Sequence, residues 1–295
     1  RRRTIMTNKK IGLLQLASLT FFLSISSFPL FIEKIIKISK SDTIISIILG
    51  SLLTLIIFKV ILSLRKKVKP KNKYLKIFIS ILLSIIFIYL LLETTTFIKD
   101  TYLSSGNFYS ILILLLLMCL VISLREFREL TSLSLILLFI FIPLFIINII
   151  GSSFSIDLTY LKVPFTSSIT NIINGGLLFF VYEIIPLSLL LFIPYKEIDA
   201  LKKQDKYLYL AIISGIIVII IDYLLLYFSS SINVLTSYNY PFMLTINSLS
   251  STFILGRLSY LISFYLLFSQ LITLSLIICV IKQLSLSKYI PMTQD

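Results

Sequence analysis

One acidic side chain, Glu183, lies in the middle of an apolar segment that we expect to span a membrane from residue 172 to residue 194. A carboxylate at such a depth costs about 2.5–3.5 kcal/mol on insertion scales, so it usually faces a polar cavity or a partner. Glu183 is therefore a candidate to contact the ammonium group of a solute, or to take up a proton in a coupled cycle. The structural alternative is that Glu183 pairs with Arg257 or with Asn174.

A second carboxylate, Asp222, lies deep in the apolar segment 207–228. We treat Asp222 and Arg257 as candidates for either a coupling role or a structural role. The structural alternative for Asp222 is a protonated, neutral carboxyl group that is hydrogen-bonded between helices.

Serines and a proline interrupt the first apolar segment at residues 24–29, which read SISSFP. Pro29 removes one helical N–H group, and the hydroxyl groups of Ser26 and Ser27 can satisfy the carbonyl groups that it frees. This pattern predicts a break in the first span. The alternative is that proline is simply frequent in membrane helices.

The sixth apolar segment carries a comparable pattern, with Asn174-Gly175-Gly176 before Glu183 and Pro186 after it. Each glycine lowers helix stability by about 1 kcal/mol relative to alanine, so we expect local unwinding at this point. The two patterns lie five spans apart, in the first and sixth segments, and a repeat unit with an odd number of spans places its second copy upside down in the membrane. This is the inverted-repeat plan of many secondary transporters, in which the interrupted helices meet near the midplane and bind the substrate. The candidate substrate-binding residues are Ser26, Ser27, Pro29, Asn174, Gly175, Gly176, Tyr182 and Glu183.

Several classes of chemistry are excluded because their residues are missing. The chain has no histidine, which removes a Ser–His triad, the usual zinc sites and a histidine proton relay. Its two cysteines, Cys119 and Cys279, lie inside apolar segments and indicate neither a disulfide nor a metal site. The Walker lysine motif is also missing, so this chain supplies no ATP hydrolysis. We expect no cofactor.

The elements that must position these residues are membrane helices. Hydrophobic residues make up 58% of the 295 residues, against about 45–50% in soluble domains, and the mean hydropathy is +1.03. The apolar residues come in blocks of about 20, the length that a helix needs to cross a bilayer. The sequence therefore predicts an all-α polytopic membrane protein, a single transmembrane domain with about eight spans, near 11–32, 43–64, 74–98, 108–124, 130–150, 172–194, 207–228 and 253–281.

The basic residues predict the orientation of these spans. The net charge is +14, and most of the 27 Lys and Arg lie in alternate short gaps between the apolar blocks. By the positive-inside rule, those gaps and both termini are cytoplasmic. The same distribution argues against a nucleic-acid-binding protein, because no basic face remains once the spans are removed.

Short motifs along most of the chain resemble the endospore germination permeases, the B-type membrane subunits of spore germinant receptors. Residues 23–29 resemble the first span of that family, and 181–183 (VYE) resemble its Phe-Gly-Glu element, with Glu183 at the acidic position. Residues 194–196 (PYK) resemble its cytoplasmic loop. Residues 240–242 (YPF), followed by Phe253, Ile254 and Arg257, resemble its Tyr-Pro segment and the start of its eighth span.

This resemblance implies an amino-acid/polyamine-permease architecture of the LeuT type, with five plus five inverted helices, here without the last two. It implies a receptor subunit in the spore inner membrane, a bacterial cell membrane, that senses a small nutrient such as an amino acid and triggers germination. The implied partners are an A-type membrane subunit and a C-type lipoprotein subunit, besides the lipid bilayer.

Two other functions stay open. An ordinary secondary transporter of amino acids or similar solutes, coupled to H⁺ or Na⁺, has the same fold and the same candidate residues. An envelope enzyme or polymer flippase is disfavoured, because such enzymes need clusters of catalytic side chains at an interface and this chain has no histidine and few charges in its outer gaps. We expect no enzymatic activity.

Overall fold

The computed structural model describes residues 10–65, 73–125, 127–153, 156–160, 167–193, 198, 204–244 and 259–286. These residues are almost entirely helical, and an isolated parallel bridge joins Ile11 to Ile198. The α-helices are α1 (Leu13–Ile25), α2 (Phe28–Ser39), α3 (Thr43–Arg65), α4 (Lys73–Thr101), α5 (Phe108–Leu124), α6 (Phe127–Ser153), α7 (Ile169–Ser188), α8 (Gln204–Ser229), α9 (Ile232–Ser237) and α11 (Ser259–Leu286). Short 3-10 helices are η1 (Lys40–Asp42), η2 (Leu158–Tyr160) and η3 (Leu189–Phe192).

The helices are long and apolar enough for a multi-pass membrane protein, which confirms that prediction. Within the described residues, six helical stretches meet the length and composition of a membrane span: Leu13–Arg65, Tyr74–Thr101, Phe127–Ser153, Ile169–Phe192, Gln204–Ser229 and Leu266–Ser285. The first stretch has 53 residues, more than twice what one crossing needs. It contains the predicted spans 11–32 and 43–64, with the turn η1 and the positive φ of Lys40 (48°) between α2 and α3. The predicted span 108–124 is α5, an apolar helix of only 17 residues.

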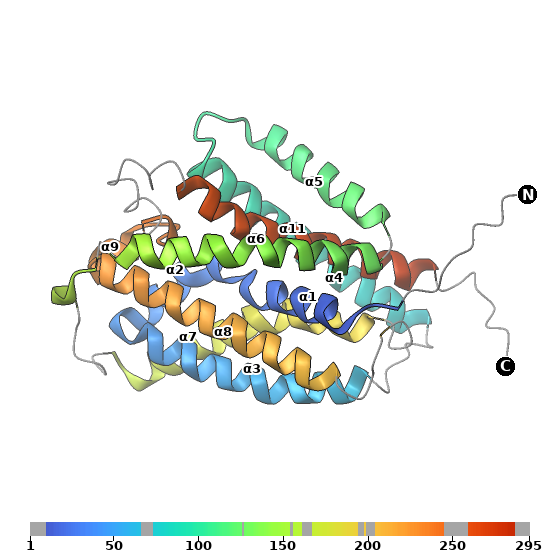
Figure 1. Ribbon diagram of the computed structural model, residues 1–295, viewed down its shortest axis with the longest axis horizontal. Helices are drawn as coiled ribbons and strands as arrows, with labels where there is room; N and C mark the ends of the chain where they lie inside the picture. The colour runs from blue at the N-terminus through green and yellow to red at the C-terminus, as the bar shows by residue number, and fades with distance from the viewer. Residues whose placement is uncertain are drawn as a thin grey trace, which may run out of the picture.

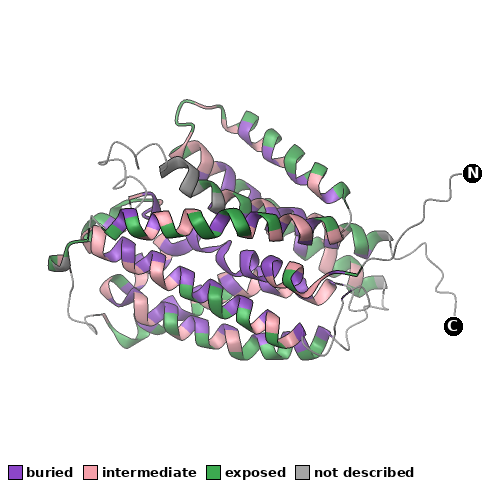
Figure 2. Cartoon of the chain, in the orientation of Figure 1, coloured by how far each residue is buried: buried purple, intermediate pink, exposed green. Residues whose placement is uncertain are grey.

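The first helical pair lies at the centre of the bundle (Figure 1). α1 packs against α6, α7, α8 and α11, while α2 packs mainly against α7. α1 begins and α11 ends at the same end of the molecule, as an arrangement with both termini on one side requires. Within the most apolar 18 residues of each stretch, 61% of the residues are buried in α11 and 56% in α8, but only 17% in α4. The burial pattern in Figure 2 agrees, because exposed residues run along the outer helices.

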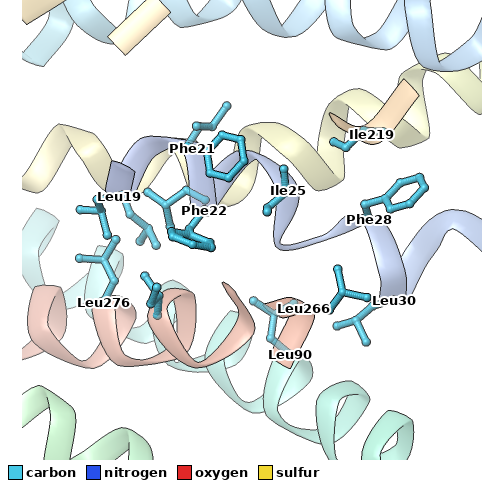
Figure 3. Close-up of a cluster of buried hydrophobic side chains, with 14 of the residues drawn as sticks. Leu19, Phe21, Phe22, Ile25, Phe28, Leu30, Leu90, Ile219, Leu266 and Leu276 are labelled. Atoms are coloured by element: carbon cyan, nitrogen blue, oxygen red, sulfur yellow. The ribbon is translucent and has the colours of Figure 1, made fainter. Parts of the chain in front are cut away.

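Large apolar side chains fill the space around α1. Leu19 and Phe22 of α1 lie beside Leu276 of α11, and Leu266 lies near Leu30 of α2 (Figure 3). Such interlocking packing is one of the forces that hold helices together in lipid, where the hydrophobic effect between helices is absent.

The unwinding expected at residues 174–176 is wrong, because α7 is a continuous helix from Ile169 to Ser188. The glycines instead allow α3 and α7 to approach closely. A Cβ atom at Gly50 of α3 would lie 2.5 Å from the carbonyl oxygen of Gly176, and one at Gly176 would lie 2.7 Å from Leu49 Cδ2. Small residues commonly mark helix contacts of this kind in membranes. The inverted repeat is not established by the described helices and stays a prediction.

Candidate functional site

The predicted break in the first span is present. α1 ends at Ile25, α2 begins at Phe28, and Ser26 and Ser27 form a turn between them. Both serines keep right-handed helical dihedral angles, so the break is a kink and not an extended segment. Pro29 is the second residue of α2, in the first helical turn, where its missing N–H group has no helical partner to lose.

The hydroxyl group of Ser27 binds a neighbouring helix at a second proline. It donates a hydrogen bond of 2.7 Å to the carbonyl oxygen of Tyr182 in α7. In a regular helix this carbonyl would accept from the N–H group four residues later, but that residue is Pro186, which has none. Ser27 therefore satisfies the carbonyl group that the proline of α7 leaves free.

A glutamine of α11 hydrogen-bonds to the backbone of the break. The side-chain amide of Gln270 donates to the carbonyl oxygen of Ser26. In a regular helix the N–H group of Leu30 would donate to this carbonyl. Here it donates to the carbonyl oxygen of Ser27 instead, at 3.3 Å. Gln270 is buried, with 2% of its surface exposed, and we did not predict a role for it from the sequence. An amide inside an apolar segment is the signal that would have identified it, because such side chains hydrogen-bond across membrane helices.

Glu183 lies one residue after Tyr182 and is buried, with 2% of its surface exposed. Among the described residues, neither of its carboxyl oxygens has a hydrogen-bond partner. The hydroxyl of Thr54 on α3 lies beside the carboxyl, but it donates to the carbonyl oxygen of Gly50 at 3.1 Å. The carboxyl group therefore has hydrogen-bonding capacity that the surrounding side chains leave unused.

The expected structural pairing of Glu183 with Asn174 does not occur. Asn174 is exposed on the surface of α7, whereas Glu183 faces the interior. Nine residues separate the two, which is two and a half turns, so they lie on opposite sides of the helix and about 13 Å apart along it. Arg257, the other proposed partner, lies outside the described residues.

A small cavity adjoins the break and Glu183, and it has room for about one water molecule. Of the candidate substrate-binding residues, it brings together Ser27, Tyr182 and Glu183. Its lining is Ser24, Ser27, Phe28, Phe31, Ile32, Ile35, Phe179, Tyr182, Glu183 and Ile219. The other candidates lie elsewhere. Ser26, in the turn after α1, donates to the carbonyl oxygen of Leu23, and Pro29 is buried in α2. Asn174 is exposed, and Gly175 and Gly176 pack against α2 and α3. As it stands, the cavity is too small for an amino acid.

The second carboxylate lies outside this lining. Asp222 of α8 is buried and accepts a hydrogen bond of 3.2 Å from the side-chain amide of Asn148 in α6. Ser152 in turn donates to the amide oxygen of Asn148 at 3.4 Å. This interhelical hydrogen bond agrees with the structural alternative for Asp222.

The segment 240–242 lies close to the break. Phe242 is fully buried, and its ring meets the ring of Phe28 edge to face at 6.0 Å. Tyr240 meets Phe97 of α4 in the same way at 5.0 Å. Burial, together with the nearby Asp100 carboxylate, raises the pKa of the Tyr240 phenol. The other parts of this resemblance, namely residues 194–196 and the residues from Phe253 to Arg257, lie outside the described residues.

Comparison with known proteins finds no family model, no curated protein and no solved structure that matches the chain. The likeness to germination permeases therefore rests on the short motifs of the sequence alone.

Proposed function

We propose that this chain is a permease-like membrane protein that binds a small ammonium-bearing solute, such as an amino acid, at the break between α1 and α2. The observation that carries the proposal is the Glu183 carboxyl group, which is buried beside the break and has no hydrogen-bond partner among the described residues. A buried carboxylate without a partner is costly, and a bound ammonium group relieves that cost.

The biological role that we propose is the membrane subunit of a spore germinant receptor. The short motifs quoted above support it, with Glu183 at the acidic position of the family. In this role the chain lies in the spore inner membrane, with both termini cytoplasmic, and works with an A-type membrane subunit and a C-type lipoprotein. Its architecture is then the LeuT-type inverted repeat. The break in the first span favours that plan, although the continuous α7 lacks the second interruption.

Solute binding requires a conformational change, because the cavity holds only about one water molecule. The structure is then a closed form, and the solute stabilises a wider form in which α2 and α7 move apart. The Ser27–Tyr182 hydrogen bond directly links the break to α7. A receptor has to convert binding into such a movement before its partners can respond to it.

A coupled secondary transporter is the second candidate, and Asp222 is the observation that favours it. This second buried carboxylate lies on α8 and is hydrogen-bonded to the neutral Asn148. A carboxyl group in such surroundings is suited to taking up and releasing a proton during a transport cycle.

Glu183→Gln tests the proposed site in spores that carry this protein as the only copy of its receptor subunit. We expect loss of the germination response to amino acids, with an unchanged amount of protein in the membrane. Glu129→Gln is the matched control, because Glu129 is exposed and pairs with Arg125 at 3.6 Å, one turn away on the surface. An unchanged response of Glu183→Gln reduces Glu183 to a structural residue.

Counterflow in proteoliposomes separates the two functions. Saturable exchange of a labelled amino acid that Asp222→Asn abolishes favours the transporter. Binding without exchange favours the receptor.

A further inference from the structure

A second polar group lies between α2 and α4, outside the lining of the Glu183 cavity. The ammonium group of Lys34 on α2 donates to the hydroxyl of Tyr89 at 3.1 Å and forms an ion pair with Glu93 at 3.3 Å. Both partners belong to α4. The sequence places Lys34 in a loop after residue 32, but α2 continues to Ser39. Lys34 is therefore part of a helix, and its ammonium group contacts the neighbouring helix α4.

Aromatic rings surround the same ammonium group. The nitrogen of Lys34 lies 5.0 Å from the ring centre of Phe31, 5.8 Å from that of Tyr89 and 6.0 Å from that of Tyr182. All three distances are within the range of about 6 Å in which a cation is attracted to the face of a ring. The ring of Phe31 is parallel to that of Tyr182, at 3.7 Å between centres, and nearly parallel to that of Tyr89 at 6.1 Å. The rings therefore stack on each other in addition to contacting the lysine.

We propose that the rings of Phe31, Tyr89 and Tyr182 and the carboxylate of Glu93 form a binding site for an alkylammonium group, and that Lys34 fills it in this structure. Stacked aromatic faces with a carboxylate are the chemistry by which proteins recognise ammonium ligands. The side chain of Lys34 is 39% exposed and that of Glu93 is 26% exposed, so the site is open on one side. An ammonium group that arrives from that side competes with a flexible lysine for the same contacts.

The neighbouring Lys37 shows what a lysine on α2 does without such a site. Its ammonium pairs with Glu33 of the same helix, and in the described part of the chain it lies over no aromatic ring. Ordinary charge pairing on this helix thus needs no contribution from α4 or α7. This makes Lys37 the natural control for Lys34.

The proposed site is distinct from the Glu183 cavity but touches it. The side chains of Phe31 and Tyr182 line the cavity and also supply two of the three rings of the site. A solute that displaces Lys34 is therefore held next to the cavity, while the released ammonium of Lys34 is free to meet a carboxylate of the same solute. The site thus fits small amines and zwitterions, and it does not depend on a role for Glu183.

Tetramethylammonium is the probe that tests this site, titrated into the purified protein in detergent against sodium chloride at equal ionic strength. Lys34→Ala removes the resident ammonium and should raise the affinity for tetramethylammonium at least tenfold over that of the unmodified protein. Saturation-transfer NMR measures this affinity. Lys34→Arg keeps a cation that competes for the rings and should show no gain, and neither should Lys37→Ala. Addition of Glu93→Gln to Lys34→Ala should lower the affinity at least tenfold, whereas addition of Glu183→Gln should leave it unchanged.

Equal affinity in Lys34→Ala and in the unmodified protein overturns the proposal. A second measurement needs no variant: the rate at which an amine reagent modifies Lys34, read by mass spectrometry, should rise several-fold with tetramethylammonium but not with sodium chloride. The rate at Lys37 should stay constant. If Lys34 reacts no faster with the probe, the ammonium is not exchanging and the proposal fails, whatever the result for Glu183 and germination.

Discussion

The hydroxyl group of Ser27 takes the place of the N–H group that Pro186 lacks, because it donates at 2.7 Å to the carbonyl oxygen of Tyr182. The kink that precedes Pro29 thus supplies the hydrogen bond that the proline of α7 removes. Two of the helices that line the Glu183 cavity, α2 and α7, are therefore joined next to a proline in each.

Ser27→Ala should lower the free energy of unfolding by about 1–3 kcal/mol, because it leaves a buried carbonyl without a donor. In a Pro186→Ala background the helix supplies its own N–H group to that carbonyl, so the same substitution should cost less than half as much. Denaturation of the four proteins of this cycle in mixed micelles measures the difference. Ser24→Ala is the control, since Ser24 donates within its own helix to Phe21. An equal cost of Ser27→Ala in both backgrounds would show that Pro186 plays no part.

Gln270→Leu should remove the hydrogen bond between α11 and the kink. The carbonyl of Ser26 then loses its donor, and we expect faster hydrogen exchange at the amides of residues 26–31 with unchanged exchange in α4. Gln15→Leu is the matched substitution, because Gln15 also makes an interhelical bond, at 2.9 Å to the Ser132 hydroxyl, but away from the kink. If both variants raise the exchange rate at residues 26–31 equally, the hydrogen bond of Gln270 does not specifically stabilise the break.

Gly50→Ala should disturb the contact between α3 and α7. The added methyl group would lie 2.5 Å from the carbonyl oxygen of Gly176 and 2.8 Å from Phe179 Cδ1, so the helices must separate. Overpacking of this kind costs about 1–3 kcal/mol, which thermal unfolding detects. Gly12→Ala should cost less than about 1 kcal/mol, because its nearest neighbour is at an ordinary 3.5 Å. Equal melting temperatures for Gly50→Ala and the unmodified protein would mean that the two helices are further apart.

The sequence predicts some features of this site well because their causes are local. A proline with flanking serines disfavours a straight helix by itself, so the break at Ser26 and Ser27 was predictable. The unwinding predicted from the glycines at 175 and 176 is wrong because the cause of their helical structure is not local. Their weak helical preference is outweighed by close packing on α3, and nothing near them in sequence indicates that partner. The predicted span ends before Lys34, because a charge is typical of a loop, whereas the structure continues α2 past this residue. The partners of its ammonium group, Tyr89 and Glu93 of α4 and Tyr182 of α7, are distant in sequence.

A cysteine at position 237 tests the orientation of the spans. Ser237 is exposed at the end of α9, and Ser285 is exposed near the end of α11. The positive-inside rule predicts that a membrane-impermeant maleimide labels Ser237→Cys in intact cells and labels Ser285→Cys only after permeabilisation. The unmodified protein gives the background of Cys119, which is buried, and Cys279, which is half-buried. The reverse pattern of labelling would invert the topology.

Binding at Glu183 is measured most directly by the thermal unfolding of the purified protein with each of the common amino acids in turn. A ligand that binds only the folded protein raises the melting temperature. We predict that at least one amino acid stabilises the unmodified protein and Glu129→Gln to the same extent, and that it leaves Glu183→Gln unchanged. Equal stabilisation of Glu183→Gln by that amino acid would contradict the proposed site.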